Sequence, residues 1–120
     1  MRRASVLLVG LSACFSNPSA PVVVTGTYTL VTVNGNQLPY VFSNGVGIAS
    51  EVLILNADGS FSDVATHSDG SVNTDIGVYS NYSGTINFGD TTQNALYQGI
   101  LDGNVLTTKV GNFVEVWQKK

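Results

Sequence analysis

The residues able to carry out acid–base chemistry are few in this chain, which has one histidine and eight acidic residues among 120. His67 lies close in sequence to Asp69 and Asp75 and could pair with either carboxylate. A nucleophilic triad also needs an activated serine or cysteine, and no serine stands out by its position. We therefore expect His67 to be a solvent-exposed turn residue, and we predict no catalytic residues and no enzyme activity.

Metal chemistry has equally little support. One histidine and one cysteine cannot build the usual zinc site. Asp69, Ser71, Asn73 and Asp75 place oxygen side chains at alternate positions, as calcium loops do, but the EF-hand glycine and closing glutamate are missing. We expect a solvated polar loop here, with no metal and no cofactor.

Three acidic residues fall in the interior of predicted strands, namely Glu51, Asp63 and Glu115. Asp63 shares a strand face with Phe61, and Glu115 shares one with Trp117, which is unusual for a dry face. Either one of these carboxyls lines the wet mouth of a barrel or the face points outward, and the sequence leaves both open. A buried carboxyl beside a tyrosine or the histidine would favour an enzyme, and exposure of every carboxyl would exclude one.

The composition favours a folded, all-β domain. Hydrophobic residues make up 43% of the chain and charged residues only 11%, which argues against disorder. Gly, Ser, Thr, Asn and Val are abundant, as is typical of strands joined by tight turns. Without Arg2 and Arg3, three lysines face eight carboxylates, so the basic patch that a nucleic-acid partner requires is absent.

The N-terminus has the pattern of an export signal. The positive Met1-Arg2-Arg3 precedes an uncharged apolar run from Ala4 to Ala13. Ten helical residues at ~1.5 Å each are too short to span a ~30 Å hydrocarbon core, so we predict a cleaved signal peptide over residues 1–13.

The sequence Leu11-Ser12-Ala13-Cys14 resembles the lipobox of bacterial lipoproteins. The resemblance implies cleavage before Cys14, lipidation of its thiol and anchoring in a membrane of the cell envelope. Phe15 follows the cysteine in place of the aspartate that retains such proteins at the inner membrane, which favours the outer membrane where the organism has one. Residues 14–21 then form the lipidated cysteine and its tether. The alternative is an ordinary signal peptide with an incidental cysteine.

Turn signals divide residues 22–120 into eight predicted strands. Asn-Gly, Asp-Gly and related pairs recur roughly every 8–13 residues, the rhythm of an antiparallel meander. Pro39 cannot donate to a ladder, so residues 38–42 are predicted to be a loop or edge piece. The eight strands are Thr25–Val33, Ile48–Asn56, Ser60–His67, Asp75–Ser80, Thr85–Gly89, Asn94–Leu101, Val105–Val110 and Phe113–Gln118.

We predict that these strands close into a small eight-stranded antiparallel up-and-down β-barrel, because closure removes exposed edges. A two-sheet sandwich is the alternative fold. The run Val52–Leu55 is apolar on both faces, which predicts that one face meets the core and that a loop or partner covers the other.

Residues of the first and last predicted strands resemble those of the lipocalin family. Gly26-Thr27-Tyr28 stands where that family has Gly-x-Trp on its first strand, and Lys119 is the nearest match to its basic residue on the closing strand. Asp58-Gly59-Ser60-Phe61 is similar to a turn of lipocalin-like domains in small bacterial lipoproteins. The resemblance implies a lipocalin-like barrel, although Tyr replaces Trp and the chain is short.

Two functions fit this prediction. The first is non-enzymatic binding of a small apolar or amphipathic ligand in a cavity. The second is a filled barrel that acts through its surface, as an envelope interaction, adhesion or inhibitor module whose protein partner the sequence does not name. The large side chains that could line a cavity are Tyr28, Tyr79, Phe88, Tyr97 and Trp117.

Overall fold

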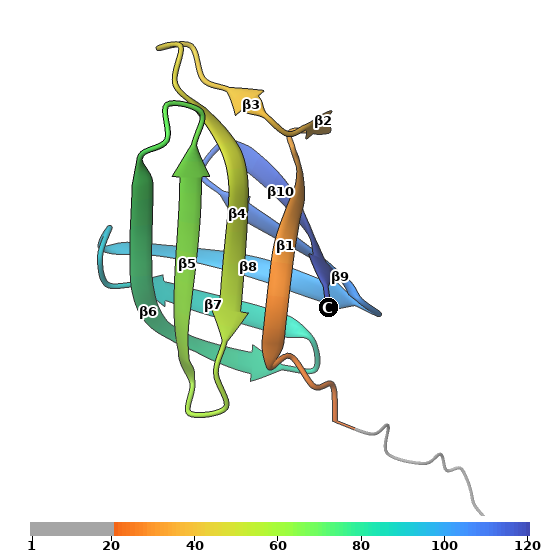
Figure 1. Ribbon diagram of the computed structural model, residues 1–120. Helices are drawn as coiled ribbons and strands as arrows, with labels where there is room; N and C mark the ends of the chain where they lie inside the picture. Colours follow the sequence, from red (N-terminus) through yellow and green to blue (C-terminus); the bar gives the residue numbers. More distant parts are fainter. Residues whose placement is uncertain (1–20) are drawn as a thin grey trace, which may run out of the picture.

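The computed structural model describes residues 21–120, and the elements in this range are all β-strands (Figure 1). The described residues contain no helix long and apolar enough to cross a membrane. The strands are β1 (Gly26–Val33), β2 (Asn36–Gln37), β3 (Tyr40–Val41), β4 (Gly47–Leu55), β5 (Ser60–His67), β6 (Val72–Tyr82), β7 (Thr85–Asp90), β8 (Ala95–Asp102), β9 (Val105–Val110) and β10 (Phe113–Lys119).

Eight of these strands form a closed antiparallel barrel. Strands β4 to β10 pair in chain order, β10 pairs with β1, and β1 pairs with β4 to complete the ring. At the closure, Tyr28 of β1 lies between Lys119 of β10 and Leu53 of β4. The predicted all-β, eight-stranded up-and-down barrel is therefore confirmed, in a layout compatible with the lipocalin-like fold.

The two short strands β2 and β3 lie outside this ring. They flank Pro39 in the connection from β1 to β4, and each pairs with only one barrel strand. This is the edge piece predicted from the proline. Asn34 and Gly35, both at positive φ (50° and 79°), make the tight turn from β1 into β2.

One end of the barrel is packed and covered, and we name it the closed end. It carries the β4–β5, β6–β7 and β8–β9 turns, and the chain enters here before β1 (Figure 1). The hydroxyl of Tyr28 donates to the carbonyl of Val24, which is itself buried. Lys119 Nζ donates to the Val23 carbonyl (2.8 Å), and its distance to the Tyr28 ring centroid is 5.9 Å. The segment before β1 is thereby fixed across this end.

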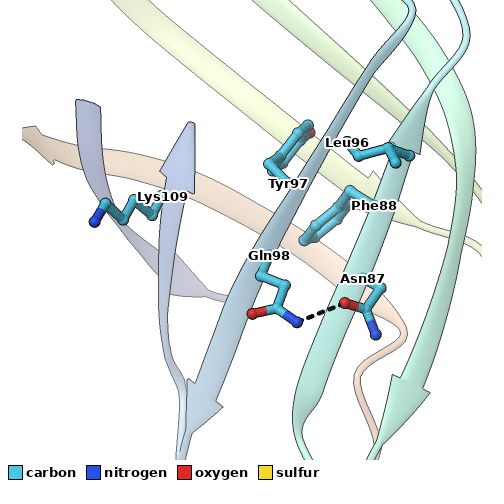
Figure 2. Close-up of a pocket in the computed structure, with 6 residues that line it drawn as sticks. All are labelled: Asn87, Phe88, Leu96, Tyr97, Gln98 and Lys109. Carbon is cyan, nitrogen blue, oxygen red and sulfur yellow. Dashed lines mark hydrogen bonds between the residues drawn. The ribbon is translucent and has the colours of Figure 1, made fainter. Parts of the chain in front are cut away.

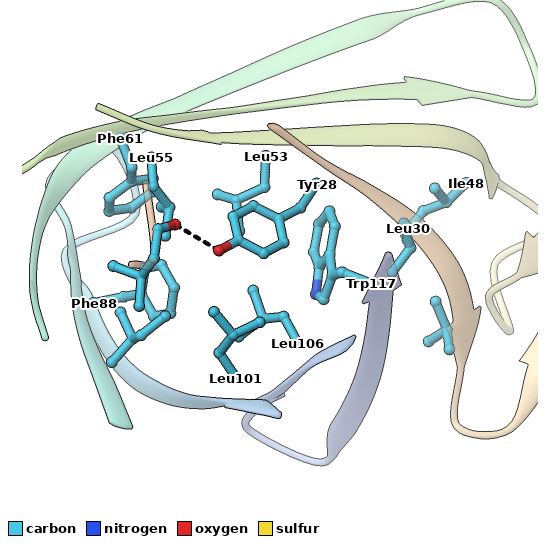
Figure 3. Close-up of a cluster of buried hydrophobic side chains, with 13 residues drawn as sticks. Tyr28, Leu30, Ile48, Leu53, Leu55, Phe61, Phe88, Leu101, Leu106 and Trp117 are labelled. Carbon is cyan, nitrogen blue, oxygen red and sulfur yellow. Dashed lines mark hydrogen bonds between the residues drawn. The ribbon is translucent and has the colours of Figure 1, made fainter. Parts of the chain in front are cut away.

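Apolar side chains fill the barrel interior above that segment (Figure 3). Successive residues of a strand point to opposite faces, so alternate positions of each strand enter the core. Trp117 and Tyr28 are the largest fully buried side chains, and the Trp117 indole N–H donates to Thr108 Oγ1 (2.9 Å). The other core residues are Val24, Leu30, Val33, Ile48, Leu53, Leu55, Phe61, Ile86, Phe88, Leu101 and Leu106.

Strand β6 bends where it changes partners (Figure 1). Its residues before Gly77 pair with β5 alone, and its residues after Val78 pair with β7 alone. A Cβ at Gly77 would lie 2.1 Å from the Gly89 carbonyl oxygen and 2.7 Å from the Phe61 ring. Only glycine therefore allows β5, β6 and β7 to approach this closely.

Two apolar stretches face outward. In the run Val52–Leu55, Leu53 and Leu55 are buried as predicted, but Ile54 on the other face is 37% exposed and Val52 is half-buried. The described residues do not cover Ile54 with a loop. Ile76 and Val78 of β6 also face solvent, at 56% and 59% exposed.

Candidate functional site

The interior is polar at the opposite end of the barrel, the open end, which carries the β5–β6, β7–β8 and β9–β10 turns. A cavity of about 170 Å³ lies there, and we call it the acidic cavity. Its lining has five carboxyl groups: Glu51, Asp63, Asp75, Asp90 and Glu115. Gln93, Ala95, Tyr97 and Val110 complete it.

Each carboxyl group comes from a different strand. Glu51 is on β4, Asp63 on β5, Asp75 on β6, Asp90 on β7 and Glu115 on β10. Every one of these positions is two residues away from an inward-facing residue of its own strand, such as Leu53, Phe61, Gly77, Phe88 or Trp117. Strand alternation therefore carries all five side chains into the barrel at a similar level, above the apolar core.

Hydrogen bonds satisfy three of the five groups. Asp90 Oδ1 accepts the backbone N–H of Gln93 (2.9 Å), and the Gln93 side chain donates to Asp75 Oδ1 (3.3 Å). Thr108 Oγ1 donates to Glu115 Oε1 (3.2 Å) and accepts the indole N–H of Trp117. Nearby hydrogen-bond donors therefore stabilise the carboxyl groups of Asp75, Asp90 and Glu115.

Glu51 and Asp63 lack such donors. Glu51 is only 7% exposed, and no N–H or O–H group among residues 21–120 donates to its carboxylate. Oδ1 of Asp63 is buried without a hydrogen-bond partner in the same part of the chain. The two side chains are within hydrogen-bonding range of one another, so a single proton shared between them is the arrangement that satisfies both.

Burial and repulsion disfavour negative charge on four of the cavity carboxyls, Glu51, Asp63, Asp75 and Glu115. Burial, the hydrogen bond that protonated Glu51 donates to Asp63 and the neighbouring carboxylates raise the pKa of Glu51 to about 10. Burial and the charge of Asp63 raise the pKa of Glu115 to about 7, although the Thr108 hydrogen bond opposes the shift. Burial also raises the pKa of Asp63 and that of Asp75. The cavity therefore holds protons at a pH where ordinary carboxyls are ionised.

Tyr97 separates the acidic cavity from a groove on the outside of the barrel (Figure 2). The groove has a volume of about 420 Å³ and is lined by Asn87, Phe88, Leu96, Tyr97, Gln98 and Lys109. Tyr97 stacks on Phe88, with ring centroids 4.7 Å apart. Burial and the surrounding carboxylates raise the pKa of the Tyr97 hydroxyl, which therefore remains a neutral donor.

The five aromatic residues that were predicted to line a cavity occupy different environments in the structure. Tyr97 lines the acidic cavity, whereas Tyr28 and Trp117 are fully buried core residues. Phe88 is in the core and contributes to the outer groove. Tyr79 is half-buried at the closed end, where its hydroxyl donates to the Asn56 carbonyl. Cys14, the predicted lipidation site, lies outside the described residues.

Only the first half of the predicted polar loop is a loop, because Asn73 and Asp75 belong to strand β6. Asp69 accepts two hydrogen bonds from Ser71 within the β5–β6 turn, whereas Asp75 points into the cavity. His67 is half-buried, with Nδ1 3.3 Å from the Gly47 carbonyl oxygen, so the prediction of a solvent-exposed side chain was wrong. It is less exposed because it ends β5 against the start of β4. Among residues 21–120, no three His, Cys, Asp or Glu side chains are placed to hold a metal ion.

Sequence reasoning identified two of the five cavity carboxyls as unusual and left their direction open. The same signal was present for the others, because Glu51, Asp75 and Asp90 also alternate with residues that face the core. The sequence analysis did not recognise that all five carboxyl residues face the interior of the same barrel.

Comparisons with family models, with curated proteins and with solved structures each returned no match. The class of this protein therefore rests on its fold and site. It is a closed eight-stranded up-and-down β-barrel with a packed apolar end and an interior acidic cavity at the other end.

Proposed function

We propose that this chain is a lipid-anchored lipocalin-like barrel of the cell envelope that binds a small amphipathic molecule and catalyses no reaction. The observation that carries the proposal is the interior cavity of about 170 Å³ at the open end of an otherwise packed barrel. Ligand sites of barrels lie in such mouths, where polar groups fix the orientation of the ligand. The packed apolar end leaves no room for a long acyl chain, which restricts the ligand to a small molecule.

The lipobox-like sequence and the fold are compatible with one another in this proposal. The described chain enters the barrel at the closed end, where Asn81 Nδ2 donates to the Val22 carbonyl (3.0 Å). An anchor at Cys14 would then tether the closed end to the membrane and leave the acidic cavity facing away from it. The contact of Lys119 with the Tyr28 ring supports the lipocalin-like assignment.

Binding is favoured over catalysis by the composition of the cavity. A carboxyl with a pKa near neutrality, such as Glu115, beside a tyrosine is also what a general acid requires. However, the cavity lining among the described residues contains no serine, cysteine, histidine or lysine. Covalent catalysis therefore has no conventional nucleophile there. Acid–base catalysis by the carboxyls is the remaining enzymatic alternative, and the experiment below tests it.

Native mass spectrometry of the intact mature protein, released gently from the producing cells' membranes, tests the proposal. We expect an additional mass that disappears on denaturation, while the covalent anchor persists. Ala95→Leu should remove this mass because the larger side chain enters the cavity, whereas Leu96→Ser, on the opposite strand face, should retain it. A chemically altered ligand after incubation would instead indicate an enzyme.

A second candidate function, action through the outer surface, is favoured by an apolar strip formed by Ile76, Val78 and Leu96. These residues are 56%, 59% and 89% exposed. Val78 and Leu96 flank Gly89 in one cross-strand row, so the missing side chain leaves a shallow slot between them. A bare protein mass, together with a crosslinked protein partner that Leu96→Asp abolishes, would establish this function instead.

A further inference from the structure

The acidic cavity has no cationic partner within the described chain. The lysines of this range lie elsewhere: Lys109 borders the outer groove, Lys119 bonds to the Val23 carbonyl at the closed end, and Lys120 follows it at the C-terminus. His67 contacts the Gly47 carbonyl. Five carboxyl groups thus converge on one cavity without a positive charge from residues 21–120 to neutralise them.

Glu51, one of the two buried carboxyls of this cavity, provides a second, independent observation. Glu51 is more than nine-tenths buried, lines the cavity and receives no hydrogen bond from a nitrogen donor or hydroxyl of residues 21–120. Asp63, which lies within hydrogen-bonding range of Glu51, is itself an acid, and its Oδ1 has no hydrogen-bond partner among residues 21–120. A buried acceptor without a donor costs stability unless something from outside supplies the donor.

We propose, building on the binding function proposed above, that the ligand of this cavity is a small organic cation, an ammonium or amine compound, whose positive group lies against Glu51 and Asp63. Such a group would supply the missing positive charge, and an ammonium that carries N–H groups would also supply the missing donors. A cavity of about 170 Å³ has room for five or six water molecules at ~30 Å³ each, which suits a compact cation. The neutral Tyr97 hydroxyl and the Gln93 amide are positioned to contact its polar remainder.

A bare metal ion fits the geometry less well. Metal ligands must converge on one point at about 2–2.6 Å, and no three carboxyls among the described residues do so. An organic cation spreads its charge over several atoms, so carboxyls distributed around a cavity can each contact a different part of it.

Protons compete with this ligand for the same groups. The titratable groups facing Glu51 are Asp63 on β5, Asp75 on β6, Asp90 on β7, Tyr97 on β8 and Glu115 on β10; β9 contributes Val110 to the cavity. Because burial raises the pKa of Glu51 and Glu115, these carboxyls hold protons when the cavity is empty and must release them to the solvent when the cation binds. Binding should therefore release protons and strengthen as the pH rises.

Calorimetric titration of the intact protein in a non-ionic detergent with choline tests this inference. Choline keeps its charge at every pH, so any pH dependence belongs to the protein. We expect binding at about pH 8, at least tenfold weaker binding near pH 5.5, and a heat that depends on the buffer because protons are released. The uncharged isostere, in which carbon replaces the nitrogen, should bind at least tenfold more weakly.

Variants separate recognition of charge from general loss of the cavity. Glu51→Gln preserves the shape of the side chain and should weaken choline binding about tenfold and abolish most of the proton release. Asp102→Asn, at the exposed end of β8 and away from the cavity lining, should change neither. Melting curves verify that both variants are folded.

The outcomes that overturn the inference differ from those that overturn the binding function. Equal affinity for choline and its uncharged isostere, an unchanged affinity in Glu51→Gln, or tight binding of calcium in place of choline would each refute the organic cation. So would a neutral ligand found by native mass spectrometry, although the binding function would then stand. Absence of any ligand mass, with no heat from choline or ethanolamine, would refute both.

Discussion

Burial of Glu51 lowers the stability of the empty barrel, and a hydrophobic residue at this position would avoid that loss. The side chain is 7% exposed and lies among carboxyls, so its ionised form is poorly solvated and repelled. Keeping it protonated removes the charge but requires the folded protein to bind a proton that the unfolded chain releases above about pH 4.5. A residue that destabilises the empty fold in this way is the kind expected at a functional site.

We predict that Glu51→Gln stabilises the empty protein. Glutamine has nearly the same shape and is neutral at every pH, so the folded state no longer needs to take up a proton. The free energy of unfolding should rise by about 1–3 kcal/mol near pH 8 and by much less near pH 4. Urea unfolding at the two pH values measures this, and a Glu51→Gln variant less stable than the parent at pH 8 would contradict it.

The strands place these residues by simple alternation. In β5, Phe61 enters the apolar core and Asp63, two residues on, enters the acidic cavity. The same step separates Phe88 from Asp90 in β7. Five of the eight barrel strands thus pass from an apolar level to an acidic level, and the barrel acquires two chemically different ends.

The close packing of β5, β6 and β7 at the bend of β6 can be tested by substitution of Gly77. Gly77→Ala should destabilise the domain by about 2–3 kcal/mol, because the new methyl group would collide with the Gly89 carbonyl oxygen and the Phe61 ring. Gly89→Ala is the matched control on the next strand. Its Cβ would meet Val78 Cγ2 at an ordinary 3.6 Å, so its free energy of unfolding should change by less than about 1 kcal/mol. Similar unfolding curves for the two variants would disprove the close approach.

For the whole molecule, the raised pKa values set the direction of the pH dependence. A carboxyl whose pKa is higher in the folded state stabilises the fold below its unfolded pKa, and this contribution is lost as the pH rises. For Glu115 the loss extends from about pH 4.5 to about 7, and for Glu51 from about 4.5 to about 10. We predict that the empty protein melts at a temperature at least about 5 °C lower at pH 8 than at pH 5.

Scanning calorimetry at several pH values checks this dependence. The double variant Glu51→Gln/Glu115→Gln should flatten the profile, since it removes the two largest contributions. Choline should raise the melting temperature at pH 8 but not at pH 5. A parent protein that melts at a higher temperature at pH 8 would show that the cavity carboxyls are already ionised in the fold.

The proposed anchor is also a property of the whole molecule. Cys14→Ser removes the thiol that lipidation requires, so we predict release of the protein from membranes and loss of acyl incorporation, with the barrel intact. Membrane fractionation with metabolic labelling by a fatty acid measures both. Unchanged membrane retention of the variant would contradict the anchor.

The order and approximate bounds of the barrel strands were determined by the sequence alone. Alternation and turn pairs such as Asn34-Gly35 are local signals, and the predicted bounds differ from the observed ones by three residues or fewer. The largest difference is at β6, which starts at Val72 because it gains its first pairs from β5. Such pairing across the sheet is not encoded in the strand itself.

The acidic cavity was decided only by the tertiary structure. The sequence shows that Asp63 and Glu115 share faces with aromatic residues, but which face is interior depends on how the sheet closes. The sequence also predicts that Tyr28, Trp117 and Tyr97 could line a cavity, yet only packing determines that the first two fill the core and the third lines the acidic cavity. Closure of β1 on β4 brings five strands' carboxyls together, because a ring makes neighbours of residues whose strands lie far apart along the chain.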